Sequence, residues 1–253
     1  MTLTLDLNKS AKALRLSLDK AGVTPGVKAE LAFAIDVSGS FEHEHEEGTT
    51  GELIRRLVPY GMVLDPDGKM DVFTFSNGEA GVHYVGTVTP EDSEDYVIRN
   101  IVGRVPGWNG GTSYSYMLER SLRHFGWLPQ MQKPAGWLLS GFLHPKPPVT
   151  PVAGPPRKKR SIVIFVTDGE CNDDDRARTM QVLQASQDRG DRVYFLLLGA
   201  CDRADFKFIQ EIARRFKNTG VVVVRELEEF VASSDDELNA QLLGPELLDW
   251  LRS

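Results

Sequence analysis

Carboxylate and hydroxyl side chains stand at the ends of apolar runs in this sequence. Asp36, Ser38 and Ser40 alternate directly after one such run. Asp168 closes a second run, in FVTDGE, and Thr112 follows the glycine-rich GWNGG. All five offer hard oxygen ligands, which suit Mg²⁺, Mn²⁺ or Ca²⁺, whereas Zn²⁺ and copper favour imidazole and thiolate. Two carboxylates and three neutral hydroxyls would leave such a cation short of negative charge and able to take a partner's carboxylate.

The elements that must position these residues alternate along the chain. Continuous apolar runs are typical of strands buried on both faces, and they occupy residues 31–37, 70–75, 161–169, 192–200 and 220–227. Residues 82–88 predict a short edge strand. Helical spacing occurs at residues 10–22, 49–64, 90–102, 115–125, 175–190 and 206–216. This alternation predicts an α/β fold with a doubly wound, mainly parallel sheet, helices on both faces and one short antiparallel edge strand.

Such a sheet would bring the five polar residues together. Ligands bind at the carboxyl ends of the strands, near the point where the strand order reverses. Asp36 and Asp168 end strands at that edge, and Thr112 enters it from a loop onto a helix N-terminus. Each residue alone has a plainer interpretation, as a helix cap for Ser38 and Ser40 or as part of an Asp-Gly turn for Asp168. The set as a whole predicts a divalent-cation site.

The same set resembles the metal-ion-dependent adhesion site of von Willebrand factor A domains. Asp36-x-Ser38-x-Ser40, then Thr112, then Asp168 in VTDGE stand in that family's order, over residues 28–230 apart from a proline-rich stretch. The resemblance implies a Rossmann-like fold in which the serines and the threonine bind metal directly and the aspartates often bind through water. DPDGKMDVFTFSN with WNGGTSY is similar to the bacterial tellurium-resistance branch, which implies a role in a stress or tellurium-resistance complex.

Composition narrows the classes of function. A formal net charge of -7 argues against a nucleic-acid binder that relies on a positive field. Two cysteines, Cys171 and Cys201, cannot form a disulfide framework, which fits a reducing compartment. The N-terminus lacks the pattern of a signal peptide, and no apolar run is long enough to span a bilayer. We therefore expect a cytoplasmic protein without a transmembrane segment.

We expect one domain over residues 1–253, with an N-terminal extension at 1–27, a proline-rich insertion at 129–160 and a C-terminal helix at 235–253. The insertion holds eight of the fourteen prolines, and a loop of this length is unusual inside a compact domain. Its apolar GWLLSGFL segment either docks on the body or meets a partner.

Other acidic stretches have plainer interpretations. EHEHEE, residues 42–47, is expected to be a solvated loop, because its two histidines lack a distant third ligand. DPDGKMD, residues 65–71, is expected to be a turn, because Ser76 stands where a calcium loop needs glutamate. Eight acids are expected to flank the metal site, namely Glu42, Glu44, Glu46, Glu47, Glu170, Asp173, Asp174 and Asp175.

These features favour a metal-dependent protein-binding module that holds a partner carboxylate through Mg²⁺, Mn²⁺ or Ca²⁺. No catalytic constellation is found. A phosphoester hydrolase with an aspartate nucleophile would want a second carboxylate where Ser38 stands, and the sequence lacks phosphate-binding glycine loops and a nucleophile elbow. A Mg²⁺-dependent phosphoester hydrolase and a scaffold with a purely structural metal stay open as alternatives.

Overall fold

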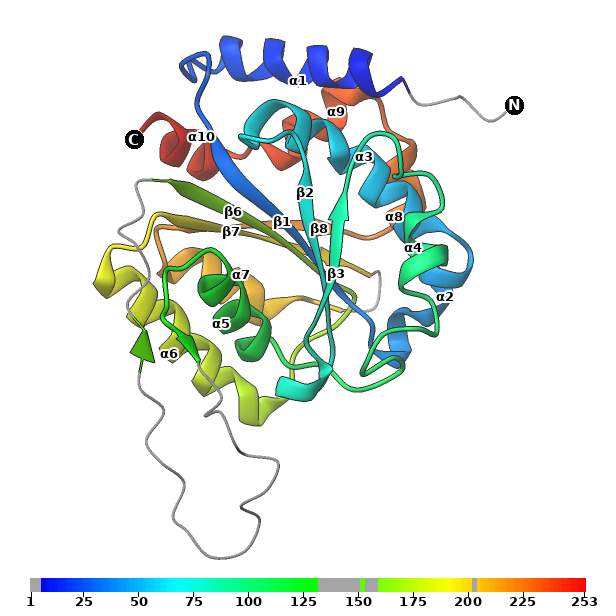
Figure 1. Cartoon of the computed structure of the whole chain (residues 1–253), viewed down its shortest axis with the longest axis vertical. Helices are drawn as coiled ribbons and strands as arrows, with labels where there is room; N and C mark the ends of the chain where they lie inside the picture. Colours follow the sequence, from blue (N-terminus) through cyan, green and yellow to red (C-terminus); the bar gives the residue numbers. More distant parts are fainter. Residues whose placement is uncertain (1–5, 132–150, 153–158, 202–203) are drawn as a thin grey trace, which may run out of the picture.

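The computed structural model describes residues 6–131, 151–152, 159–201 and 204–253. Its main sheet contains β1 (Ala29–Asp36), β2 (Met70–Phe75), β3 (His83–Val88), β6 (Arg160–Thr167), β7 (Val193–Ala200) and β8 (Thr219–Val224). The strand order is β3-β2-β1-β6-β7-β8 (Figure 1). All neighbours are parallel except the antiparallel pair β2 and β3. This arrangement confirms the predicted α/β sheet and its short antiparallel edge strand.

Helices cover both faces of this sheet (Figure 1). One face packs against α1 (Leu7–Lys20), α3 (Thr49–Leu64), α4 (Tyr96–Asn100), α8 (Leu227–Ala232), α9 (Asp235–Leu242) and α10 (Pro245–Arg252). The other face packs against α5 (Ser115–His124), α6 (Asp173–Arg189) and α7 (Lys207–Arg215). The strand β7 is apolar and buried throughout because successive side chains enter opposite cores: Phe195 and Leu197 face the second helix group, whereas Leu196 and Leu198 face the first.

Three elements differ from the prediction. β8 is an edge strand, so its valines are not all buried, and Val223 is 42% exposed. The helix expected over residues 90–102 shrinks to α4, whose N-cap Asp95 has a positive φ of 55°. The single C-terminal helix is instead two, α9 and α10, separated at Leu243 and Gly244. Pro245 causes this break, because it lacks an N–H group and starts a new helix at its first turn.

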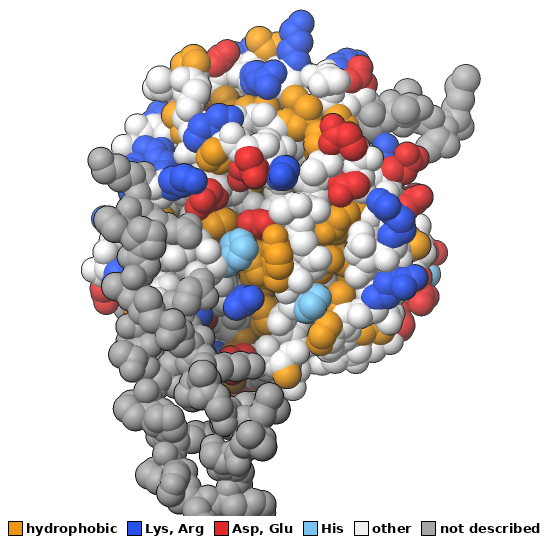
Figure 2. All heavy atoms as spheres, viewed as in Figure 1, with side chains coloured by type: hydrophobic (Ala, Val, Ile, Leu, Met, Phe, Trp, Pro, Cys, Tyr) orange, Lys and Arg blue, Asp and Glu red, His pale blue; other side chains and the backbone are white. Residues whose placement is uncertain are grey.

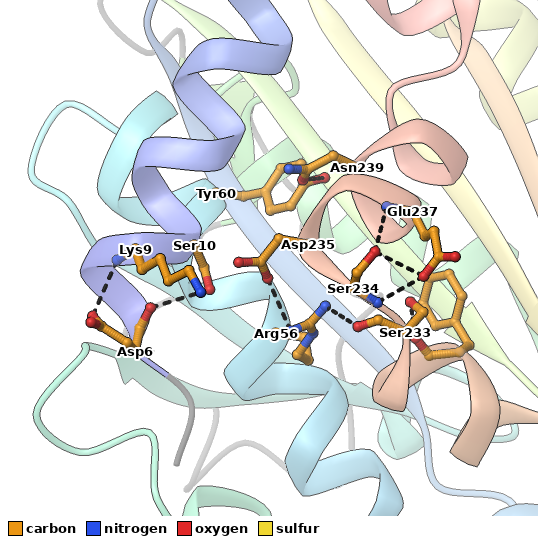
Figure 3. Close-up of polar contacts among 11 residues, drawn as sticks. Asp6, Lys9, Ser10, Arg56, Tyr60, Ser233, Ser234, Asp235, Glu237 and Asn239 are labelled. Carbon is orange, nitrogen blue, oxygen red and sulfur yellow. Dashed lines mark hydrogen bonds and ion pairs between the residues drawn. The ribbon is translucent and has the colours of Figure 1, made fainter. Parts of the chain in front are cut away.

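The helix α9 and Ser233 before it are tied to α3 by a partly buried polar network (Figure 3). Arg56 Nη1 lies 3.0 Å from Asp235 Oδ1, and Arg56 Nη2 donates a 2.8 Å hydrogen bond to the Ser233 carbonyl. Tyr60 donates its hydroxyl proton to Asn239 Oδ1 at 2.8 Å. The helix α3 continues through Pro59, where the sequence predicts a bend or an end. These contacts hold α9 against α3.

Most of the predicted insertion, including its GWLLSGFL segment, lies outside the described residues. Its ends form a short antiparallel pair, β4 (Gln130–Met131) with β5 (Pro151–Val152). Within the described ranges, every helix is too short or too polar to cross a membrane. Figure 2 shows acidic and basic side chains interspersed over the face seen in Figure 1.

Candidate metal centre

The candidate site lies where the strand order of the sheet reverses. From β1 the chain passes to β2 on one side, and it later returns to β6 on the other side. The register pairs Ile35 with Val166, so Asp36 and Thr167 end adjacent parallel strands at the same level. Asp168 follows directly. This is the position at which doubly wound sheets bind ligands.

A glycine-rich loop carries Thr112 to the same place. Its backbone runs beside the end of β1, with Asn109 N donating to the Val37 carbonyl at 2.9 Å and Gly39 N donating to the Gly110 carbonyl at 3.1 Å. Gly107 has a φ of +78°, and a Cβ there would lie 2.0 Å from Ser76 Oγ. No other residue fits this position without displacing the loop, which explains why the chain uses glycine ahead of Thr112.

The Asp36 carboxylate is fully buried and held on both oxygens. Oδ1 accepts a hydrogen bond from Ser38 N at 2.9 Å. Oδ2 accepts one from Thr167 Oγ1 at 2.7 Å and a longer one from Thr112 Oγ1 at 3.4 Å. Burial raises the pKa of Asp36 to about 7; the Thr167 hydrogen bond opposes this, and the nearby Asp168 charge adds to it. A cation would favour the charged form of this carboxylate.

The two serines and Asp168 complete the set. Ser38 Oγ lies 3.3 Å from Ser40 Oγ, and Ser40 is exposed whereas Ser38 is buried. Asp168 is 6% exposed, and its Oδ1 has no hydrogen-bond partner among the described residues. Burial raises the pKa of Asp168, hydrogen bonds from Ser40 and Ser38 oppose the rise, and the Glu44 charge adds to it. The structure therefore brings together all five residues that the sequence singles out, Asp36, Ser38, Ser40, Thr112 and Asp168; we call them the five-residue site.

The chemistry of the five-residue site fits a hard cation. A buried carboxylate oxygen without a partner, as at Asp168, is costly unless a cation or water satisfies it. In the described part of the chain, no three or more His, Cys, Asp or Glu side chains cluster as metal ligands. The five-residue site has only two carboxylates, so hydroxyls and water would have to supply the remainder of the roughly six oxygens that Mg²⁺ takes.

Sequence reasoning missed Thr167 and His45. Thr167 donates to Asp36 as described, and its place beside Asp168 at a strand end was a usable signal. His45 Nε2 lies 2.8 Å from the Asp36 carbonyl, and Nδ1 lies 2.8 Å from Thr50 Oγ1. Burial lowers the pKa of His45 to about 4, so the ring is neutral at pH 7. Because a carbonyl only accepts, Nε2 carries the proton.

The segment around His45 also corrects an expectation. EHEHEE does not form a solvated loop; it forms the short helix α2 (Glu42–Glu46), and His45 is fully buried. Phe41 and Trp108 pack around the imidazole, with ring centroids 5.1 Å and 5.4 Å from it. The turn expected over residues 65–71 is confirmed for 65–68, with Gly68 N donating to the Asp65 carbonyl at 3.3 Å, whereas Met70 and Asp71 already belong to β2.

Asp175 is a third residue that sequence reasoning misplaced. It was expected to be one of the acids flanking the metal, but it is buried and caps the start of α5. Its Oδ2 accepts hydrogen bonds from Tyr114 N at 2.6 Å, Ser115 N at 3.0 Å and Thr179 Oγ1 at 3.0 Å, and its Oδ1 accepts from Ser115 Oγ. Asp175 therefore fixes the helix that begins just after Thr112.

Comparisons with known proteins support the fold. No family model matches the sequence. The uncharacterised protein YcbR of Bacillus subtilis is 23% identical in an alignment over 259 residues. The alignment covers 98% of this chain and 87% of that protein. The N-terminal domain of TFIIH p34 superposes with a TM-score of 0.51 at 10% identity, covering 81% of this chain and 95% of that domain.

Two further solved structures resemble the chain more loosely. Proximal thread matrix protein 1 from the mussel byssus has a TM-score of 0.49 at 18% identity and covers 89% of this chain, which spans 48% of the mussel protein. The manganese-loaded TRAP protein of Plasmodium vivax has a TM-score of 0.45 at 16% identity. The superposition covers 88% of this chain and 75% of the TRAP chain. The six-stranded, mostly parallel sheet with helices on both faces is consistent with a von Willebrand factor A or Rossmann-like fold.

Proposed function

We propose that this chain is a divalent-cation-dependent protein-binding module, with the cation held by the five-residue site. The observation that carries the proposal is the convergence of two buried carboxylates and three hydroxyls at the reversal point of the sheet, where Asp168 Oδ1 has no hydrogen-bond partner within the described ranges. Such a donor set suits Mg²⁺, Mn²⁺ or Ca²⁺.

The five residues have two kinds of role in this proposal. Ser38, Ser40 and Thr112 would hold the cation, and Asp36 and Asp168 would supply the negative charge, as the family resemblance implies. When bound, the cation supplies an electrostatic attraction for a carboxylate from a partner protein. Ser40 is exposed, so the site is open to solvent on its side. Because the directly bound donors would be neutral hydroxyls, the cation would keep a position that favours a charged oxygen from a partner.

A biological setting follows from the resemblance in sequence. We propose that the chain acts as a single domain in a bacterial stress or tellurium-resistance complex. The similarity of DPDGKMDVFTFSN and WNGGTSY to the tellurium-resistance branch supports this setting. A strain that lacks the gene would then lose tellurite tolerance, and the Asp36→Asn variant would fail to restore it.

Partner retention tests the proposed function. The immobilised chain is incubated with lysate of its source organism in Mg²⁺ and then washed with a chelator. We expect a specific protein in the chelator eluate of the wild type and of Asp174→Asn, an exposed acid outside the site, but not of Asp168→Asn. An acid-to-amide substitution in that partner should abolish its retention. A partner that stays bound without metal would indicate a scaffold with a structural cation and would contradict the proposal.

A further inference from the structure

A groove of about 630 Å³ opens beside the five-residue site, a size typical of ligand pockets. Ser40 and Asp168 of the site form part of its wall. The rest of the wall comes from α2, from the segment after β7 and from residues 225–228 at the start of α8. A partner segment that reaches the cation through this opening must therefore lie along the groove.

The wall of the groove is strongly acidic. Five of its side chains are carboxylates: Glu44, Glu47, Asp168, Glu226 and Glu228. One guanidinium, from Arg225, also lines it, so the formal charge of the wall is five negative against one positive, or -4 with His43 neutral. Glu226 and Glu228 are exposed and, within the described residues, no hydrogen bond or ion pair engages either side chain. Their charges are available to a partner.

The residues of the groove wall differ in what they would attract. Asp168 is 6% exposed and its Oδ1 has no hydrogen-bond partner among the described residues, so this part of the wall would face the cation. A divalent cation there would offset the nearby carboxylates and attract one acidic side chain. Glu47, Glu226 and Glu228 line the same groove outside the five-residue site and would repel further acids.

We propose that this groove selects partner segments in which the metal-bridging Asp or Glu is flanked by Lys or Arg. This inference rests on the proposed function, because the acidic anchor of the segment binds the cation. The basic flank adds charge complementarity along Glu226 and Glu228. Exposed charge pairs of this kind change affinity by about fivefold at most each, and salt weakens them. The groove therefore determines which partner segments bind, and the cation holds their acidic side chain.

A peptide selection tests the inference. A bead library of randomised peptides with a fixed central Asp is incubated with the full chain in Mg²⁺, and the peptides released by chelator are sequenced. We expect Lys and Arg to be enriched near the Asp for the wild type. The double variant Glu226→Gln, Glu228→Gln should lose this enrichment while its Mg²⁺ affinity is unchanged. A matched control, Glu94→Gln with Glu211→Gln, removes the same charge from exposed residues outside the groove and should retain the enrichment.

The possible outcomes separate this inference from the proposed function. Chelator-released peptides without enriched Lys or Arg would overturn the groove inference and leave the proposed function standing. Equal loss of enrichment in both double variants would also overturn it, because overall charge would then explain the selection. If the wild type releases no more peptide to chelator than Asp36→Asn does, the proposed function fails, and the inference fails with it.

Discussion

Neighbours that bind no metal themselves position the Asp36 carboxylate. Thr167 Oγ1 donates to Asp36 Oδ2 and also lies 3.1 Å from the Gly169 carbonyl, so it connects the ends of two strands. His45 holds the Asp36 carbonyl from the other side. In metal proteins, such supporting residues fix the orientation and basicity of the ligands, and their loss weakens binding about 10- to 100-fold.

Thr167→Val should weaken Mg²⁺ and Mn²⁺ binding by about tenfold or more, because Asp36 Oδ2 loses its shorter hydrogen bond. Calorimetric titration measures this affinity. The matched control is Thr74→Val, since Thr74 is also fully buried in a strand but its hydroxyl has no partner among the described residues. That variant should bind metal like the wild type. Equal affinities for all three proteins would remove Thr167 from the support of the site.

Cys171 is expected to be chemically inert in the folded chain. It is 3% exposed, and burial raises the pKa of its thiol to about 12, with the nearby Asp175 charge adding to the rise. At pH 8 the thiol is therefore protonated and a poor nucleophile. Mass spectrometry after treatment with iodoacetamide should show slow labelling of Cys171 in native protein and fast labelling in urea. Fast labelling of the native protein would contradict this expectation.

At the scale of elements, the first turn of α6 fixes the start of α5. Asp175 accepts two backbone N–H groups of α5, which otherwise lack partners at a helix N-terminus. Arg178 donates to Ser115 Oγ at 2.7 Å from the same helix. Thr112 leads into this start, so the packing of two helices decides where this proposed metal ligand lies.

Asp175→Asn should destabilise the protein by roughly 2–3 kcal/mol, because an amide nitrogen would face buried donors. It should also weaken metal binding, since Thr112 loses its support. Asp174→Asn, one residue earlier and exposed, is the control and should change neither property. Urea unfolding and metal titration measure the two effects. Wild-type values for Asp175→Asn would show that α5 is held in place without this cap.

The sheet and the five-residue site were predictable because both depend on local pattern. Apolar runs set the strands, and polar residues directly after them fall at one edge for any doubly wound sheet. The cap at Asp175 was not predictable, because it acts on residues brought near only by folding, such as Tyr114, 61 positions away. His45 bonds to near neighbours in sequence, but its ring packs against the distant Trp108, which folding alone brings near. The C-terminal break at Pro245 was predictable from that residue alone.

At the scale of the whole molecule, not all of the eight acids expected to flank the five-residue site crowd it. Asp175 is a cap, Glu42 accepts a hydrogen bond from Asn109, and Arg176 lies within 3.5 Å of Glu170 and 3.2 Å of Asp173. Glu44 still adds to the pKa of Asp168, and the groove is acidic. These carboxylates would repel one another without a cation, and a bound cation would relieve that repulsion.

Binding of a cation should therefore raise the melting temperature. A ligand at a hundredfold excess over its Kd stabilises the folded state by about 2.7 kcal/mol, or roughly 5–10 °C for a chain of this size. Scanning calorimetry in millimolar Mg²⁺, Mn²⁺ or Ca²⁺ should show the rise, and it should be largest at low ionic strength. A rise of the same size with a high concentration of Na⁺ would indicate diffuse screening instead.

The most direct test of the central claim is a Mn²⁺ titration followed by the electron paramagnetic resonance signal of free Mn²⁺. The wild type should bind one equivalent, and Mg²⁺ should displace it. The double variant Asp36→Asn, Asp168→Asn should bind none while it still melts cooperatively. If the folded double variant takes up one equivalent with the affinity of the wild type, or the wild type shows no saturable binding, the five-residue site is not a metal centre.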